Sequence, residues 1–160
     1  MAPHVFEENY FSYVERNLRI LSGFYGILKP FDGIVPHRLE MQAKLSIENN
    51  KDLYEFWGKD IYNELIKDDD IIIDLTSKEY RKCIEKYLSK EIQFISCIFG
   101  EISDGKIIEK GVYVKMARGE MVRYLAENKI NWPEEIKKFD RLGYKYNKNL
   151  SGDRKYVFLK

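Results

Sequence analysis

Residues 71–88 read IIIDLTSKEYRKCIEKYL and join a strand pattern to a helix pattern. The run from Ile71 to Leu75 is continuous and mostly β-branched, which predicts a central strand buried on both faces. Thr76 and Glu79 have the spacing of a capping box, in which each side chain bonds a backbone N–H at a helix start. The apolar residues that follow recur at helical intervals. A strand that passes directly into an amphipathic helix indicates a fold that mixes sheet and helix.

Patterns of the same two kinds continue on both sides of this stretch. Apolar periodicity predicts further helices over residues 7–20, 51–66, 117–129 and 134–139. Short β-rich runs predict strands over residues 24–28, 92–99 and 107–108, with a hairpin turn at Ser103-Asp104-Gly105-Lys106 between the last two, and a final hairpin over 144–146 and 155–159. Together they predict an α+β fold with a mixed sheet and packed helices. The length of 160 residues predicts one domain over residues 1–160.

Composition limits the class of protein. The chain is 44% apolar and 33% charged, which suits a folded protein with a real core. No apolar run reaches the length that crosses a bilayer, and the N-terminus lacks the pattern of a signal peptide. Cys83 and Cys97 stand inside apolar patterns, which predicts two reduced, buried thiols. We therefore expect a cytoplasmic protein without a membrane partner.

The net charge of +1 conceals an uneven distribution. Residues 1–80 carry 9 Lys/Arg and 15 Asp/Glu, whereas residues 81–160 carry 18 and 11. A basic half favours a polyanionic partner, and phosphate contacts give affinity without sequence specificity. The alternative is that these charges only solvate helix faces and hairpin edges.

No self-contained catalytic motif is present, so enzymatic activity stays open. The serines lack the Gly-x-Ser-x-Gly elbow, no glycine-rich phosphate loop occurs, and His4 and His37 lie far apart. We expect no metal or cofactor. Asp74 ends a strand at a position where α/β sites often form, but a short polar side chain also bonds locally there.

The stretch Val114 to Tyr124 is the most suggestive for binding. Lys115 and Arg118 fall at the start of the predicted helix, where backbone N–H groups and both cations would hold a phosphate. The alternative is a surface network of ion pairs, and for Arg123 the glutamates at helical spacing are sufficient partners. Lys29 and Arg38 flank a proline turn that suits a binding loop.

Several segments resemble the YaaA family of bacterial peroxide-stress proteins. They read LRILSGFYGILKPFD at 18–32, PHRLEM at 36–41, KDLYEFW at 51–57, DLTSKEY at 74–80 and KMARG at 115–119, with Arg123-Tyr124, Glu127-Asn128 and Gly143-Tyr144 beyond them. The similarity extends from about Phe6 to Leu159. The Leu-Ser-Gly-x-Tyr-Gly and Arg-Leu-Glu-Met blocks are its most specific parts.

The resemblance implies a cytosolic protein of the oxidative-stress response to hydrogen peroxide. It implies DNA binding through a basic cleft and a helix-hairpin-helix element. The cleft residues that match the family pattern are Lys29, Arg38, Lys115, Arg118 and Arg123. Supporting positions are Tyr25, Asp74, Ser77, Glu79 and Tyr124. The two tyrosines could stack on bases, with core packing as the alternative.

The sequence also departs from the family. Family members have a further N-terminal region, and no Gly-x-Gly hairpin between two helices is found in this chain, so it resembles the C-terminal part of the family fold. We expect exposed apolar surface, self-association, or a separate N-terminal partner fragment. DNA binding has two alternatives. The first is an enzyme that acts on a nucleotide or phosphorylated substrate, with Asp74, Ser77 and Glu79 near Lys115 and Arg118. The second is a truncated remnant without independent activity.

Overall fold

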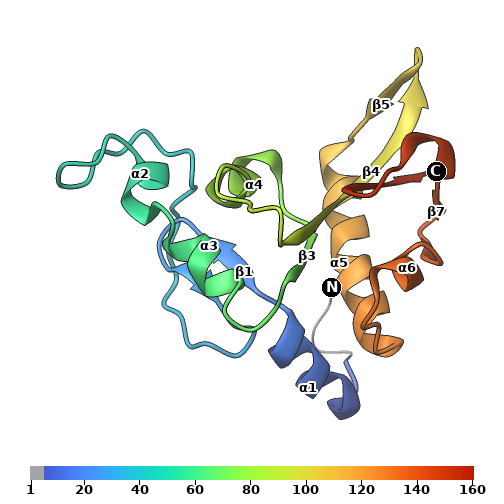
Figure 1. Ribbon diagram of the computed structural model, residues 1–160, viewed down its shortest axis with the longest axis horizontal. Helices are drawn as coiled ribbons and strands as arrows, with labels where there is room; N and C mark the ends of the chain where they lie inside the picture. Colours follow the sequence, from blue (N-terminus) through green and yellow to red (C-terminus); the bar gives the residue numbers. More distant parts are fainter. Residues whose placement is uncertain (1–5) are drawn as a thin grey trace. The chain divides into compact units, whose positions relative to one another are not determined.

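The computed structural model describes residues 6–160 and confirms an α+β fold (Figure 1). Its contacts divide the chain into two compact units. Unit 1 holds residues 6–16, 73–75 and 94–160, and unit 2 holds residues 17–72 and 76–93. The prediction of a single domain stays a prediction. Among residues 6–160, no helix combines the length and the apolar character needed to cross a bilayer.

Unit 1 is built on a mixed sheet. Its strands are β3 (Ile71–Asp74), β4 (Gln93–Ser103), β5 (Lys106–Ile108), β6 (Asp140–Arg141), β7 (Tyr144–Tyr146) and β8 (Lys155–Leu159). The first residues of β3 and β4, at 71, 72 and 93, are counted in unit 2. The order is β3-β4-β8-β7-β6, and β5 pairs with β4. β4 and β8 are parallel, whereas β7 pairs antiparallel with both β6 and β8. The predicted hairpins, β4 with β5 and β7 with β8, are both confirmed.

The central strand of the sheet is β4, not β3. β3 stands at the end of the strand order, and Ile71 to Ile73 are only half-buried. β4 has neighbours on both sides, and its side chains from Phe94 to Cys97 are buried. The prediction of a central position for β3 was wrong because a β-branched run indicates a strand, not its place in the sheet.

Helices α1 (Glu8–Asn17), α5 (Gly111–Glu127) and α6 (Pro133–Ile136) accompany this sheet, with a short 3₁₀ turn at Lys148–Leu150. The core joins β4 to α5 and β8. Its most buried members are Ile95, Cys97, Phe99, Val114, Ala117, Met121, Ile136, Phe139, Tyr144 and Phe158. The rings of Phe99 and Phe158 stack with centroids 5.2 Å apart. The hydroxyl of Tyr13 in α1 donates to the carbonyl oxygen of Ile130 at 2.5 Å.

Unit 2 contains a two-stranded hairpin and three short helices. These are β1 (Ile20–Ser22), β2 (Gly26–Leu28), α2 (Leu53–Trp57), α3 (Asp60–Leu65) and α4 (Lys78–Glu85). One helix was predicted over residues 51–66, but the chain breaks it at Gly58. That glycine has a φ of 47°, and its N–H bonds back to Tyr54 to close α2. Glycine adopts a positive φ more easily than any residue with a Cβ, so it suits this break in the chain.

The predicted capping box at the start of α4 does not form. Ser77 occupies the N-cap position without a side-chain hydrogen bond to the helix, and the Thr76 hydroxyl donates to the carbonyl oxygen of Ser77. The Glu79 carboxylate instead accepts the backbone N–H of Gln42 at 3.1 Å. Glu79 therefore ties the loop before α2 to α4 within unit 2.

Both cysteines are confirmed as free and buried. Burial is the main reason that the pKa of the Cys83 thiol is raised to about 11. His4 lies outside the described residues.

Candidate functional site

The β1–β2 hairpin of unit 2 is closed by the segment Ser22 to Gly26. The Ser22 hydroxyl oxygen accepts the backbone N–H groups of Phe24 and Tyr25, each at 3.2 Å. Gly26 has a φ of +72°, a conformation that disfavours any residue with a Cβ. The sequence Leu-Ser-Gly-x-Tyr-Gly is thus explained locally by a serine-bonded turn and a left-handed glycine.

Trp57 at the end of α2 packs against this hairpin. Its indole N–H donates to the carbonyl oxygen of Gly23 at 3.0 Å. Gly26 touches the other side of the indole so closely that a Cβ there would lie 2.8 Å from a ring carbon. The hydrogen bond and the packing together fix the orientation of the ring.

The loop after β2 folds back over the hairpin. The Tyr25 hydroxyl accepts the backbone N–H of Val35 at 3.0 Å, and a ring nitrogen of His37 lies 3.3 Å from the Ser22 hydroxyl. Further along, Gly23 approaches the backbone of Leu39 so closely that a Cβ would lie 2.7 Å from its carbonyl oxygen. The segments 18–32 and 36–41, which carry the most specific sequence blocks, therefore form one packed substructure.

This loop also presents apolar side chains to solvent. Phe31, Ile34 and Val35 are 57%, 56% and 62% exposed. Their backbone is held by the Val35 contact, and the Lys29 N–H donates to the Asp32 carboxylate at 2.7 Å. The expected exposed apolar surface is present in this loop.

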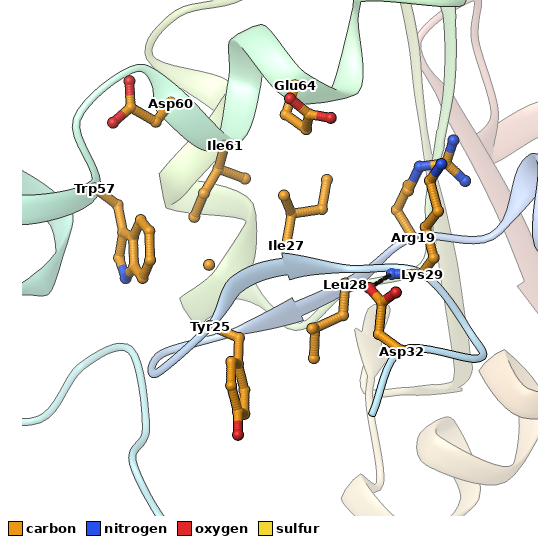
Figure 2. A pocket seen from close by; sticks show the side chains of 11 residues that line it. Arg19, Tyr25, Ile27, Leu28, Lys29, Asp32, Trp57, Asp60, Ile61 and Glu64 are labelled. Atoms are coloured by element: carbon orange, nitrogen blue, oxygen red, sulfur yellow. Dashed lines mark hydrogen bonds between the residues drawn. The ribbon is translucent and has the colours of Figure 1, made fainter. Parts of the chain in front are cut away.

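A pocket of about 440 Å³ lies between the hairpin and helices α2 and α3 (Figure 2). Its lining consists of Arg19, Tyr25, Gly26, Ile27, Leu28, Lys29, Asp32, Trp57, Asp60, Ile61 and Glu64. Figure 2 shows Arg19, Lys29 and Asp32 at one end and Trp57 at the other, with Ile27 and Ile61 between them. The pocket thus has a charged end and an aromatic end, separated by an apolar stretch.

The charged groups of the pocket nearly balance. Two cations, Arg19 and Lys29, share the lining with the carboxylates of Asp32, Asp60 and Glu64. Glu64 forms an ion pair with Lys67. The hydrogen bond from Lys67 is the largest cause that lowers the pKa of Glu64, and the charges of Lys29 and Arg19 also lower it. Glu64 is therefore ionised at neutral pH and lies within electrostatic reach of both cations.

Two of the predicted site residues, Tyr25 and Lys29, line this pocket. Sequence reasoning missed Arg19, Trp57, Asp60 and Glu64. Trp57 fell on the apolar face of a predicted helix, so its pattern indicated core packing. Asp60 and Glu64 are four residues apart on α3 and resembled ordinary solvated charges. Only the return of the chain from β2 to α3 brings these groups together.

The remaining predicted residues of unit 2 lie outside the pocket lining. Arg38 is almost fully exposed, with its guanidinium 4.0 Å from the Glu40 carboxylate. Ser77 occupies the N-cap position of α4 without a side-chain hydrogen bond to the helix, and Glu79 is bonded to the Gln42 backbone. These two residues have structural roles at the start of α4.

Lys115, Arg118 and Arg123 all belong to α5 in unit 1, but not at its start. The helix begins at Gly111, six residues before the predicted start, so Lys115 and Arg118 lie one and two turns inside it. The predicted start of the helix is therefore wrong, and free N–H groups at that start no longer support a phosphate site at Lys115 and Arg118. Val114 belongs to the buried row of the helix and was the signal for an earlier start.

The arginines of α5 have glutamate partners. Arg118 lies 3.4 Å from the Glu109 carboxylate, with 18% of its side chain exposed. Arg123 bonds Glu127 at 2.6 Å, as the ion-pair interpretation expected. The other expected partner, Glu120, instead bonds Arg141, which also reaches Glu127. Lys115 is exposed.

The supporting residues of unit 1 are packed inside it. Asp74 is buried, and its carboxylate accepts the Ser96 hydroxyl across the sheet at 3.2 Å. Tyr124 packs edge-on against Phe139 with the guanidinium of Arg141 over its ring. Asp74 belongs to unit 1 and Ser77 and Glu79 to unit 2, so no single unit contains the catalytic cluster proposed for an enzyme.

The fold also redistributes the charge asymmetry of the two sequence halves. Unit 1 carries 15 Lys/Arg and 13 Asp/Glu, and unit 2 carries 12 and 13. The basic residues of α4 belong to unit 2, where they offset its acidic segment. Neither unit is strongly basic, so a polyanion would have to bind through a local arrangement of cations.

Comparison with known proteins places the chain in context. Residues 1–150 match the model of a family described as peroxide stress protein YaaA. A UPF0246 protein of Desulfitobacterium hafniense is 59% identical over all 160 residues, which are 64% of its length. UPF0246 proteins of Lachnoclostridium phytofermentans and Agathobacter rectalis are 56% and 57% identical over 160 and 158 residues, which are 63% and 64% of their lengths. The chain thus spans less than two thirds of these relatives, and it belongs to the YaaA family of peroxide stress proteins.

Proposed function

We propose that this chain binds nucleic acid in the peroxide-stress response, through the pocket of unit 2. Trp57 would contact an unpaired base, Tyr25 would support the hairpin beside it, and Arg19 and Lys29 would contact the phosphate. The family description supports the link to peroxide stress. The observation that carries the binding proposal is the joint lining of one pocket by two cations and a fixed indole. The proposal includes a cytosolic location, where bacterial DNA lies.

The pocket suits an unpaired strand better than a duplex. Stacking of a base on an aromatic side chain contributes about 1–3 kcal/mol and does not depend strongly on sequence. The fixed orientation of Trp57 lowers the entropic cost of such a contact. The carboxylates in the lining limit the electrostatic part, so we expect stacking to dominate.

Salt dependence measures the electrostatic part. Each phosphate neutralised on a single strand contributes about −0.7 to the slope of log affinity against log salt, so two pocket cations give a slope no steeper than about −1.4. A cleft that contacts many phosphates would give a much steeper slope. Arg118 and Arg123 are engaged by glutamates, and we expect them to add little to the slope.

Fluorescence anisotropy with labelled, partly single-stranded DNA across a salt series tests the proposal. We expect the overhang substrate to bind at least tenfold more tightly than a blunt duplex, and Arg19→Ala with Lys29→Ala to remove most of this binding. Lys44→Ala with Lys90→Ala removes two exposed lysines outside the pocket and serves as the matched control. Equal losses in both double variants, or equal binding of duplex and overhang, would contradict pocket binding.

A further inference from the structure

We infer that the pocket of unit 2 is a mononucleotide site, which accepts one base, one sugar and one phosphate, and that Glu64 restricts it to a ligand with a single phosphate group. The ligand can come from two sources, a free nucleoside monophosphate or an unpaired nucleotide of a strand. The relevance of the second source rests on the proposed function. The first source is independent of DNA binding.

The dimensions of the pocket support a ligand of this size. A volume of about 440 Å³ lies at the lower end of the range of small-molecule sites, roughly 300–1,000 Å³. This volume is enough for one nucleotide and too small for a stacked base pair with its two backbones. Because the aromatic and cationic groups lie at opposite ends, a ligand must be long enough to reach both (Figure 2).

The order of groups along the pocket matches the order of groups in a nucleotide. Trp57 offers a flat apolar face for a base, and Ile27 and Ile61 form the middle of the lining, where a sugar would lie (Figure 2). Arg19 and Lys29 come next and are suited to a phosphate. Asp60 lines the Trp57 end, where a carboxylate can accept the N–H groups of a base (Figure 2).

The charge of the lining limits the number of phosphates. Arg19 and Lys29 share the lining with Asp32, Asp60 and Glu64, so the pocket has little positive charge to spare, and a monophosphate or phosphodiester, with one or two negative charges, suits it better than a more highly charged group. A diphosphate or triphosphate brings more negative charge and meets the Glu64 carboxylate, which lines the same pocket on the α3 side, within electrostatic reach of both cations (Figure 2). Like charges at close range repel, and the Glu64 side chain is 45% exposed, so we expect a moderate selection by Glu64 against polyphosphates.

The fluorescence of Trp57 reports occupancy directly. The chain has two tryptophans, and Trp132 is 68% exposed in the other unit, so Trp132→Phe leaves Trp57 as the only reporter. Circular dichroism would verify that this variant is folded. On titration with AMP, ATP and adenosine, we expect AMP to quench saturably and the other two to bind about tenfold more weakly.

Two matched variants isolate the role of Glu64. Glu64→Gln frees Lys67 from its ion pair, and Glu55→Gln frees Lys51 from an equivalent pair outside the pocket. We expect Glu64→Gln to bring ATP to within about threefold of AMP, while Glu55→Gln leaves the tenfold preference unchanged. Equal affinities of AMP and ATP in the wild-type pocket, or the same response in both variants, would overturn the selection by Glu64.

The two ligand sources give separable results. If AMP and an overhang oligonucleotide compete for Trp57, the mononucleotide site and the proposed function both stand. AMP binding without oligonucleotide binding supports the site and overturns the proposed function. Oligonucleotide binding without AMP binding overturns the mononucleotide site and leaves the proposed function intact.

Discussion

Substitution of Gly26 by alanine tests the packing that fixes the candidate site. Gly26 has a φ of +72°, and an added Cβ would lie 2.8, 2.9 and 3.0 Å from three carbons of the Trp57 ring. The ring cannot simply swing away, because its N–H is bonded to Gly23. The variant must therefore lose this hydrogen bond or strain the hairpin.

The loss of folding free energy in Gly26→Ala has two parts. An alanine in the left-handed conformation costs about 1–2 kcal/mol. Overpacking against a fixed ring costs about 1–3 kcal/mol more. Gly105 is the matched control, because its φ is also +72° but nothing lies within 4 Å of its Cβ position. Gly105→Ala should therefore cost only the first part.

Urea unfolding followed by Trp57 fluorescence and by circular dichroism measures both variants. With a slope of about 1–3 kcal/mol per molar urea, the extra packing cost places the midpoint of Gly26→Ala roughly 1 M below that of Gly105→Ala. Binding of AMP should also be lost in Gly26→Ala under conditions where it remains folded. If the two midpoints coincide, the indole is not held in the way described, and the fixed aromatic wall has to be abandoned.

Three further perturbations follow from the structure. Burial raises the pKa of the Cys83 thiol to about 11, so only about one molecule in ten thousand carries the thiolate at neutral pH. Hydrogen peroxide and thiol reagents should therefore leave Cys83 intact until urea unfolds the protein, and rapid labelling of Cys83 in the native protein would contradict this. The hydrogen bond from Arg123 holds the pKa of Glu127 below its ordinary value. The ion pair therefore stabilises the fold fully above the ordinary pKa, and this stabilisation is lost as the pH falls through the lowered pKa of the folded state. Glu127→Gln should flatten the acid side of a plot of melting temperature against pH, and an unaltered acid side would exclude the effect. We also propose self-association through the exposed loop after β2, which contains Phe31 and Val35. The double variant Phe31→Ser with Val35→Ser should have a lower average mass than the wild type in sedimentation at high protein concentration. Equal masses of variant and wild type at every concentration would argue for another surface.

The sequence was sufficient for elements whose signals are local. The periodicity around Cys83 predicted α4, and Asp104-Gly105, with positive φ at both residues, predicted the hairpin of β4 and β5. Prediction from the sequence failed where a long-range contact replaces a local one. Glu79 bonds Gln42 instead of its own helix start, and the place of β3 in the sheet depends on the strand that pairs beside it.

The candidate site was predictable only in part for the same reason. Lys29 follows a predicted strand and precedes a proline, so its position in a turn could be inferred. Trp57 has the spacing of a core residue, and only the contact with Gly23 and Gly26 turns its ring into a pocket wall. Arg118 looked exposed and functional at a predicted helix start, but the earlier start of α5 places it beside Glu109.

The pairing of β4 with β8 has a consequence for biosynthesis. Ser96 lies opposite Lys155 in this parallel pair, so the sheet of unit 1 cannot be completed until the last strand has been translated. Residues 17–93 include all of unit 2, and they emerge from the ribosome before β8 does. During translation the hairpin and its pocket can therefore form while β4 still lacks β8. The buried face of β4, from Phe94 to Phe99, is the segment of the nascent chain that most needs protection by a chaperone.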